Sequence, residues 1–252
     1  MTIQVGPDLA LAFGLLFARA GGVILGLPAM LGVEVPLQVR VLLALVLAAA
    51  LMPLANVALP AVSGVLPVAL LVARELALGV MLAFAAALVT GAAIMAGDLI
   101  GAGMELNSGA LVRGAAEMPN IAADSFGAFA GLLFFVGGFH RLLLIALARS
   151  LRAAPLGQLT LPSPATLIHS GGQVFVIALG LGLPLLIPLF ILALAQGVIA
   201  RLAPQVNILT AAPAAVLLAG LALLALDATG LAAGITRAWS MVTMQTLGWL
   251  GG

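Results

Sequence analysis

Long stretches without charge constrain this chain more than any other feature. The run from Val41 to Ala73 covers 33 residues without one Asp, Glu, Lys or Arg. Over all 252 residues the chain is 64% hydrophobic and 7% charged, whereas a typical soluble domain is about 25% charged. A soluble fold of this size cannot bury so much apolar surface, so the sequence predicts an integral membrane protein or part of a membrane complex.

The apolar stretches indicate an all-α membrane protein with about six hydrophobic segments in one unit spanning residues 1–252. They are rich in Leu, Ala, Val and Gly and lack the repeated ten-residue alternation of a transmembrane barrel. Pro184 and Pro188 interrupt the fifth segment and favour a bend or a hairpin there. The expected segments are Leu9 to Leu27, Val41 to about Asn56, Pro67 to Ala96, Asp124 to about Arg149, Pro164 to Ala200 and Leu209 to Leu226, followed by a weakly amphipathic tail from Asp227.

Several classes of function find no support in the composition. The chain has no Cys and two distant His residues, so neither a thiolate nucleophile nor a metal site is expected. Its net charge of +1 shows no excess of basic residues of the kind that binds nucleic acid. Lys is absent, and with it the phosphate-binding glycine loop. We therefore expect no catalytic set, no metal and no cofactor.

The segment from Gly97 to Pro119 stands out because it combines charge with glycine. It contains four of the seventeen charged residues and five glycines. Glycines favour bends and close backbone approach, so we expect an irregular, partly polar loop here. Irregular backbone at membrane depth needs burial in protein or a watery cavity. A solvent loop and a buried or pore-lining loop are equally consistent with these residues.

A few polar residues and glycines within the apolar segments are candidate contact sites. Arg19 needs a partner, or it extends to the membrane interface. Arg74 and Glu75 point about 100° apart on a helix, so at least one of them is expected to pair elsewhere. Gly127 and Gly131 give the fourth segment a close-packing face. His140, beside an Arg, is more typical of a structural residue than of a proton relay.

An ordered set of motifs resembles one family. From Phe17 to about Asp227 the chain resembles the FliR/SctT family of type III export gate subunits, whose flagellar and injectisome members are close relatives. Two departures concern the turn after Asn207, where Ala211 and Ala212 replace a usual Gly-Phe, and residues 111–114, which lack a common Asp-Pro. The motifs are FARAGGVILGLP, VPLQVRVLLALVLAAALMP, RELALGVMLAF, AGDLIGAGMELN, FFVGGFHRLLL, SLRAAPLG and RLAPQVNILTAAP.

The resemblance implies a structural, gate-forming subunit built of kinked helical hairpins in a hetero-oligomeric export gate. Its partners would be FliP-like and FliQ-like subunits, with FlhB-like and FlhA-like export proteins nearby, in the bacterial inner membrane at a flagellar basal body or injectisome base. Unfolded protein substrates would pass through the centre. No cofactor is implied.

The resemblance also assigns roles to residues. The segment from Gly97 to Pro119 corresponds to the family's pore plug, with Gly101, Gly103, Met104, Glu105 and Asn107 in it. Contacts between subunits are assigned to Arg19, Arg74, Glu75, Gly127, Gly131, His140, Pro204, Gln205 and Asn207.

Two other classes of function remain open at this point. A secondary transporter for a small molecule also uses broken helices and sparse intramembrane charge, although the sequence has no repeated half. An intramembrane enzyme would need a convergent catalytic set that the sequence does not offer.

Overall fold

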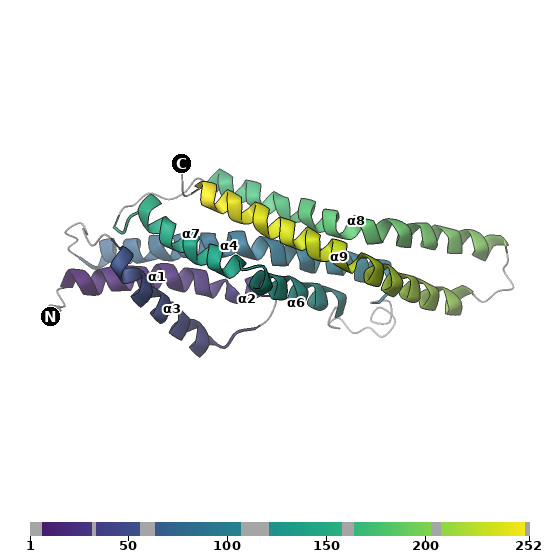
Figure 1. Cartoon of the computed structure of the whole chain (residues 1–252), viewed down its shortest axis with the longest axis horizontal. Coiled ribbons are helices and arrows are strands. Elements are labelled where there is room, and N and C mark those ends of the chain that lie inside the picture. Colours follow the sequence, from purple (N-terminus) through teal and green to yellow (C-terminus); the bar gives the residue numbers. More distant parts are fainter. Residues whose placement is uncertain are drawn as a thin grey trace.

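The computed structural model describes residues 7–31, 34–55, 64–106, 121–157, 164–202 and 208–249. Within these ranges every regular element is a helix (Figure 1). Five helices are long and apolar enough to cross a membrane, or six if the bent pair α6 and α7 forms one span. The expectation of an all-α membrane protein with about six hydrophobic segments is confirmed. The elements are α1 (Pro7–Leu25), α2 (Leu27–Leu31), α3 (Leu37–Leu51), the 3₁₀ helix η1 (Met52–Leu54), α4 (Val65–Gly103), α6 (Ile121–Val136), α7 (Phe139–Ala153), α8 (Pro164–Leu202) and α9 (Ile208–Trp249).

Helix α4 is the centre of the molecule. It packs against α1, α2, α6, α7, α8 and α9, and its 39 residues are apolar around most of the circumference. Many of its buried side chains are alanines, including Ala85, Ala92 and Ala96. Small side chains let neighbouring helices approach on several sides. Figure 1 shows α8 and α9 as a long antiparallel hairpin along one side of this core.

The predicted start of the polar loop at Gly97 is wrong, because α4 continues to Gly103. A Cβ atom on Gly97 would lie 2.8 Å from the carbonyl oxygen of Ala122 and 2.9 Å from the Cα of Ala123. Such distances are too short for any residue with a side chain. Gly97 therefore lets α6 pack closely against α4 and does not mark a bend.

The fourth predicted segment is two helices. Helices α6 and α7 are bent by 70° at the break between them, where Gly138 has the left-handed φ of 72°. Asp124 lies in the first turn of α6, which begins at Ile121, so the predicted cap is misplaced. The single helix expected from Asp124 to Arg149 is wrong because Gly138 provides a turn that other residues rarely adopt.

The C-terminal half contains two long helices. Helix α8 continues through Pro184 and Pro188. Of the two expected arrangements, a bend or a hairpin, the hairpin is therefore wrong, because each proline removes one backbone hydrogen bond without ending the helix. Helix α9 also continues past Asp227, where the sequence predicted a separate tail. One carboxylate does not end a helix whose flanking residues are apolar.

Candidate functional site

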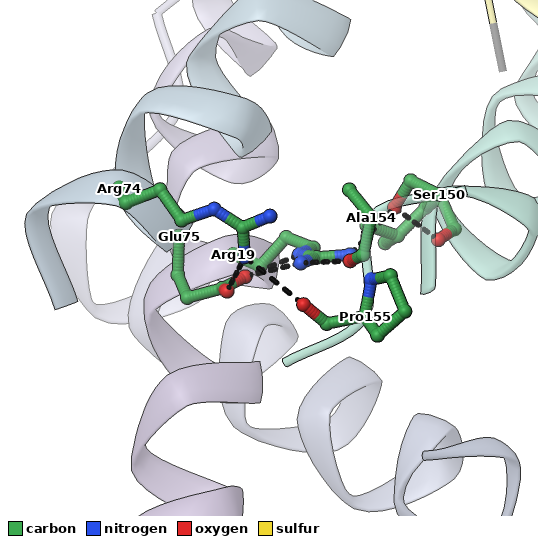
Figure 2. Close-up of polar contacts among 7 residues, drawn as sticks. Arg19, Arg74, Glu75, Ser150, Ala154 and Pro155 are labelled. Carbon is green, nitrogen blue, oxygen red and sulfur yellow. Dashed lines mark hydrogen bonds and ion pairs between the residues drawn. The ribbon is translucent and has the colours of Figure 1, made fainter. Parts of the chain in front are cut away.

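A buried cluster of charged residues joins α1, α4 and the end of α7 (Figure 2). Arg19 and Glu75 are fully buried, and Arg74 is 4% exposed. Nε of Arg19 donates to Oε2 of Glu75 at 2.5 Å, and Nη1 of Arg74 donates to Oε1 of the same carboxylate at 2.5 Å. Glu75 therefore lies between two guanidinium groups and uses both of its oxygens.

The guanidinium of Arg19 is bonded at all three nitrogens. Besides the bond to Glu75, Nη1 donates to Oγ of Ser150 at 3.1 Å and Nη2 donates to the carbonyl oxygen of Ala154 at 2.8 Å. Arg74 adds a bond from Nη1 to the carbonyl oxygen of Pro155 at 3.1 Å. Carbonyls at a helix end lack partners within the helix and carry partial negative charge. The two Arg side chains, which come from other helices, thus bond to carbonyls at and just beyond the end of α7.

Two glycines hold α1 and α4 close enough for this pairing. A Cβ on Gly22 would lie 2.8 Å from the backbone nitrogen of Val80 and 2.9 Å from the Cα of Gly79. A Cβ on Gly79 would in turn overlap the carbonyl oxygen of Arg19. Neither glycine can carry a side chain without separating the helices. The close crossing of α1 and α4 brings the side chain of Arg19 against that of Glu75.

The chemistry of this cluster suits a structural role, in which ion pairs and hydrogen bonds hold the helices together. Its charges are desolvated, and removing one partner from such a cluster leaves an uncompensated buried charge. Each guanidinium nitrogen of Arg19 donates to an acceptor inside the chain, and the residue is fully buried, so this group is committed to the packing of the helices.

The structure places three predicted subunit-contact residues inside one chain. Arg19 and Arg74 each donate to Glu75 and to a carbonyl at or just beyond the end of α7, and the assignment of these three residues to contacts between subunits stays a prediction. Of the two alternatives left open for Arg19, a partner or extension to the membrane interface, the structure shows a partner. Residues Ser150 and Ala154 were missed. Their motif, SLRAAPLG, contributed to the family resemblance, but its serine carried no separate signal in the sequence.

The remaining predicted contact residues are dispersed. Gly131 meets the backbone of Leu31, so it joins α6 to α2 within the chain, and Gly127 is buried on the same helix. His140 is half-buried, with its ring 5.6 Å from that of Phe135. Its Nδ1 is buried without a hydrogen-bond partner among the described residues. Pro204, Gln205 and Asn207 lie outside the described residues.

A second candidate site lies where α4 ends. Gly101 is buried in the last turns of the helix, and Gly103 is its last residue. Met104 is 2% exposed and packs against Gly220 of α9, whereas Glu105 is exposed and has a left-handed φ of 56°. Asn107 lies outside the described residues. The predicted plug residues therefore divide into a buried anchor and an exposed turn.

An open cleft of about 530 Å³ adjoins this turn. Ala102, Gly103 and Glu105 form one wall, and apolar side chains of α8 form the other, among them Leu183, Ile187 and Phe190. Helix α8 exposes Phe190 by 65%. The end of α4 therefore lies beside a largely apolar surface that carries one exposed carboxylate.

Metal chemistry has no support in the described part of the chain. The ranges given above hold no group of three or more His, Cys, Asp or Glu side chains that could bind a metal ion.

Comparison with known proteins identifies the family. Residues 10–242 match the family described as Bacterial export proteins, family 1. This range includes every residue of the charged cluster and the end of α4. A search among curated proteins found no match. The chain therefore belongs to the FliR/SctT family of bacterial export proteins and is a membrane component of a bacterial export apparatus.

Proposed function

We propose that this protein is a structural, gate-forming subunit of a type III protein export apparatus, in its flagellar form. In this proposal it assembles in the bacterial inner membrane with FliP-like and FliQ-like subunits, beside FlhB-like and FlhA-like export proteins. The assembly forms and closes the pore through which unfolded proteins leave the cytoplasm. Family membership and the ordered motifs support this assignment.

The exposed apolar surface of α8 and α9 carries the proposal. The apolar window of α8, Gly171–Leu202, has 32 residues, and that of α9, Ala212–Gln245, has 34. At 1.5 Å per residue these windows are about 48 and 51 Å long, whereas the hydrocarbon core of a bilayer is about 30 Å thick. In an 18-residue apolar stretch of each helix, only 28% and 17%, respectively, are buried within the chain. An exposed apolar surface of this length supports packing against other apolar subunits.

The end of α4 is the proposed gate element. Met104 is anchored under α9, and Glu105 and Leu106 project from the turn that follows. A flexible thioether at the base suits a segment that must yield to a passing chain. We propose that Gly101, Gly103, Met104, Glu105 and Asn107 belong to the plug. The assignment of Pro204, Gln205 and Asn207 to subunit packing rests on the motif resemblance.

The charged cluster argues against a small-molecule transporter. Such a protein needs polar groups that become available to a substrate near the bilayer midplane. Here the buried guanidinium of Arg19 is bonded at all three nitrogens, and Glu75 is bonded at both oxygens. These groups serve the packing of three helices.

Co-purification tests the proposal. The chain is expressed with its FliP-like and FliQ-like neighbours, extracted in mild detergent and weighed by native mass spectrometry. We expect one copy of this chain with several copies of the small subunits. A stable monomer or homodimer that does not bind the FliP-like and FliQ-like subunits would contradict the proposal. Complementation of flagellar and of injectisome deletion strains then distinguishes the two systems.

A cross-link tests the gate. The chain has no Cys, so Glu105→Cys introduces a single reactive site at the exposed turn. We expect this variant to cross-link to a stalled export substrate in the assembled complex. The matched control is Arg152→Cys, which lies on the exposed end of α7. Equal cross-linking from both positions would argue against a pore at the end of α4.

A further inference from the structure

A second groove lies between α8 and α9, away from the cluster and from the end of α4. It has a volume of about 450 Å³ and opens near the start of α8 and the end of α9. These ends lie together beside the C-terminus in Figure 1. Its walls are apolar apart from two side chains, with lining residues that include Gln173, Val176, Gly180, Leu181, Gly234 and Arg237.

The two polar side chains of this groove have unused hydrogen-bonding capacity. Arg237 is exposed, and its Nε donates to the carbonyl oxygen of Ala233 at 3.2 Å within α9. Among the described residues, its two terminal nitrogens donate no hydrogen bond. Oε1 of Gln173 is buried and has no donor in the same part of the chain. A cation and a buried acceptor in one apolar groove call for a ligand with an anion, a donor and an apolar part.

We propose that this groove binds a glycerophospholipid whose headgroup carries a hydrogen-bond donor. The phosphate accepts from the guanidinium of Arg237, and the headgroup ammonium or hydroxyl donates to Oε1 of Gln173. An acyl chain lies along the apolar walls. Phosphatidylethanolamine and phosphatidylglycerol satisfy this requirement, and phosphatidylcholine does not, because its trimethylammonium has no N–H.

The position of the groove favours lipid over a protein helix. Gln173 lies two residues from the start of the apolar range Gly171–Leu202, and Arg237 lies eight residues before the end of Ala212–Gln245. Arg side chains toward the ends of membrane helices extend to the phosphates of the bilayer surface. A protein helix would have to supply both an acidic residue and a donor at the same depth. The inference is independent of the proposed gate.

Four variants of the full-length chain test the site. Arg237→Gln removes the cation, and Arg201→Gln is its control on the exposed far end of α8. Gly180→Leu fills the groove, since a Cβ at Gly180 meets no atom within 4 Å. Gly197→Leu is the matched control, because it adds the same side chain to open space on the same helix.

The chain is purified from vesicles of phosphatidylethanolamine and phosphatidylglycerol, and native mass spectrometry counts the phospholipids that remain bound. We expect Arg237→Gln and Gly180→Leu to retain about tenfold less lipid, as for loss of a charge-assisted bond, and both controls to match the wild type. A melting curve for each variant establishes that it is folded. Equal retention in all four variants would overturn the proposal.

Headgroup selectivity provides a second test. In vesicles of phosphatidylcholine we expect weak retention by the wild-type chain, and we expect Gln173→Leu to abolish the preference between headgroups. Equal binding of phosphatidylcholine by the wild type would overturn the assignment. So would a cross-link from Gly180→Cys to a partner subunit in the assembled complex, because the groove would then hold protein.

Discussion

Gly79 of α4 lies directly against the carbonyl oxygen of Arg19 of α1. Glu75 precedes Gly79 by four residues, which is about one helical turn. The contact that brings the two backbones together therefore also sets the side chain of Arg19 against the carboxylate of Glu75. The close packing of the two backbones and the ion pair between the side chains depend on each other at this crossing, so a change in either is expected to disturb the other.

Adding a methyl group at the crossing is expected to destabilise the protein. Gly79→Ala places a Cβ on the Arg19 carbonyl and 2.9 Å from the Cα of Gly22, and overpacking of this kind costs about 1–3 kcal/mol. Thermal unfolding in detergent measures the effect. Gly91→Ala, on the same helix with no neighbouring atom within 4 Å, is the control and is expected to be neutral or stabilising. Equal melting of both variants would show that the crossing is not tight.

Neutralising the carboxylate is expected to cost more. Glu75→Gln leaves the guanidinium groups of Arg19 and Arg74 buried without their counter-ion, and breaking a buried pair costs about 3–5 kcal/mol. Folded yield and melting temperature report the loss. Glu34→Gln, at an exposed position, is expected to change neither. If Arg19→Met is combined with Glu75→Gln, the two losses should be less than additive, because each removes the same interaction.

The bend between α6 and α7 is expected to depend on Gly138. Its φ of 72° costs a residue with a Cβ about 1–2 kcal/mol, so Gly138→Ala should lower the melting temperature. Gly138→Asn should lower it less, because Asn tolerates the left-handed region better. No neighbouring atom lies within 4 Å of a Cβ here, so a difference between the two variants would report backbone conformation alone. Identical losses would contradict this explanation.

The anchor of the proposed gate can be tested as a pair. A Cβ on Gly220 would lie 2.5 Å from Cγ and 2.8 Å from Sδ of Met104, so Gly220→Ala should cost about 1–3 kcal/mol. Met104→Ala should cost about 2–5 kcal/mol through the cavity that it leaves. On the Met104→Ala background, Gly220→Ala should cost little, because the crowding atoms are gone. Additive losses would indicate that the two residues do not contact each other in solution.

The apolar composition was enough to predict the fold class, and the family motifs were enough to predict the family. The boundaries of individual helices were harder to predict, because a glycine can either end a helix at a turn or allow close packing within one, and the sequence alone does not distinguish these two roles. Gly97 was interpreted as the start of a loop, yet it allows the close packing of α6. Gly138, which does turn the chain, lay within a predicted helix.

The site was predictable only in part. Arg19 is conspicuous because a buried cation needs a partner, and Glu75 is conspicuous for the same reason. Their pairing with each other depends on the crossing of α1 and α4, which no local pattern encodes. Ser150 could not be predicted from the sequence. Its hydroxyl, near the end of α7, accepts from Arg19 only because the fold brings the two residues together.

The partners of Arg19 in the charged cluster are synthesised after it, at different times. Glu75 is made 56 residues after Arg19, and the carbonyl of Ala154 follows Arg19 by 135. At about 5–20 residues per second, the ribosome needs several seconds to supply the first partner and longer to supply the last. During that interval the newly made α1 carries a cation that nothing in its final position neutralises. We therefore expect α1 to reach its mature depth in the membrane only after α4 has emerged, and to be held there only when α7 arrives.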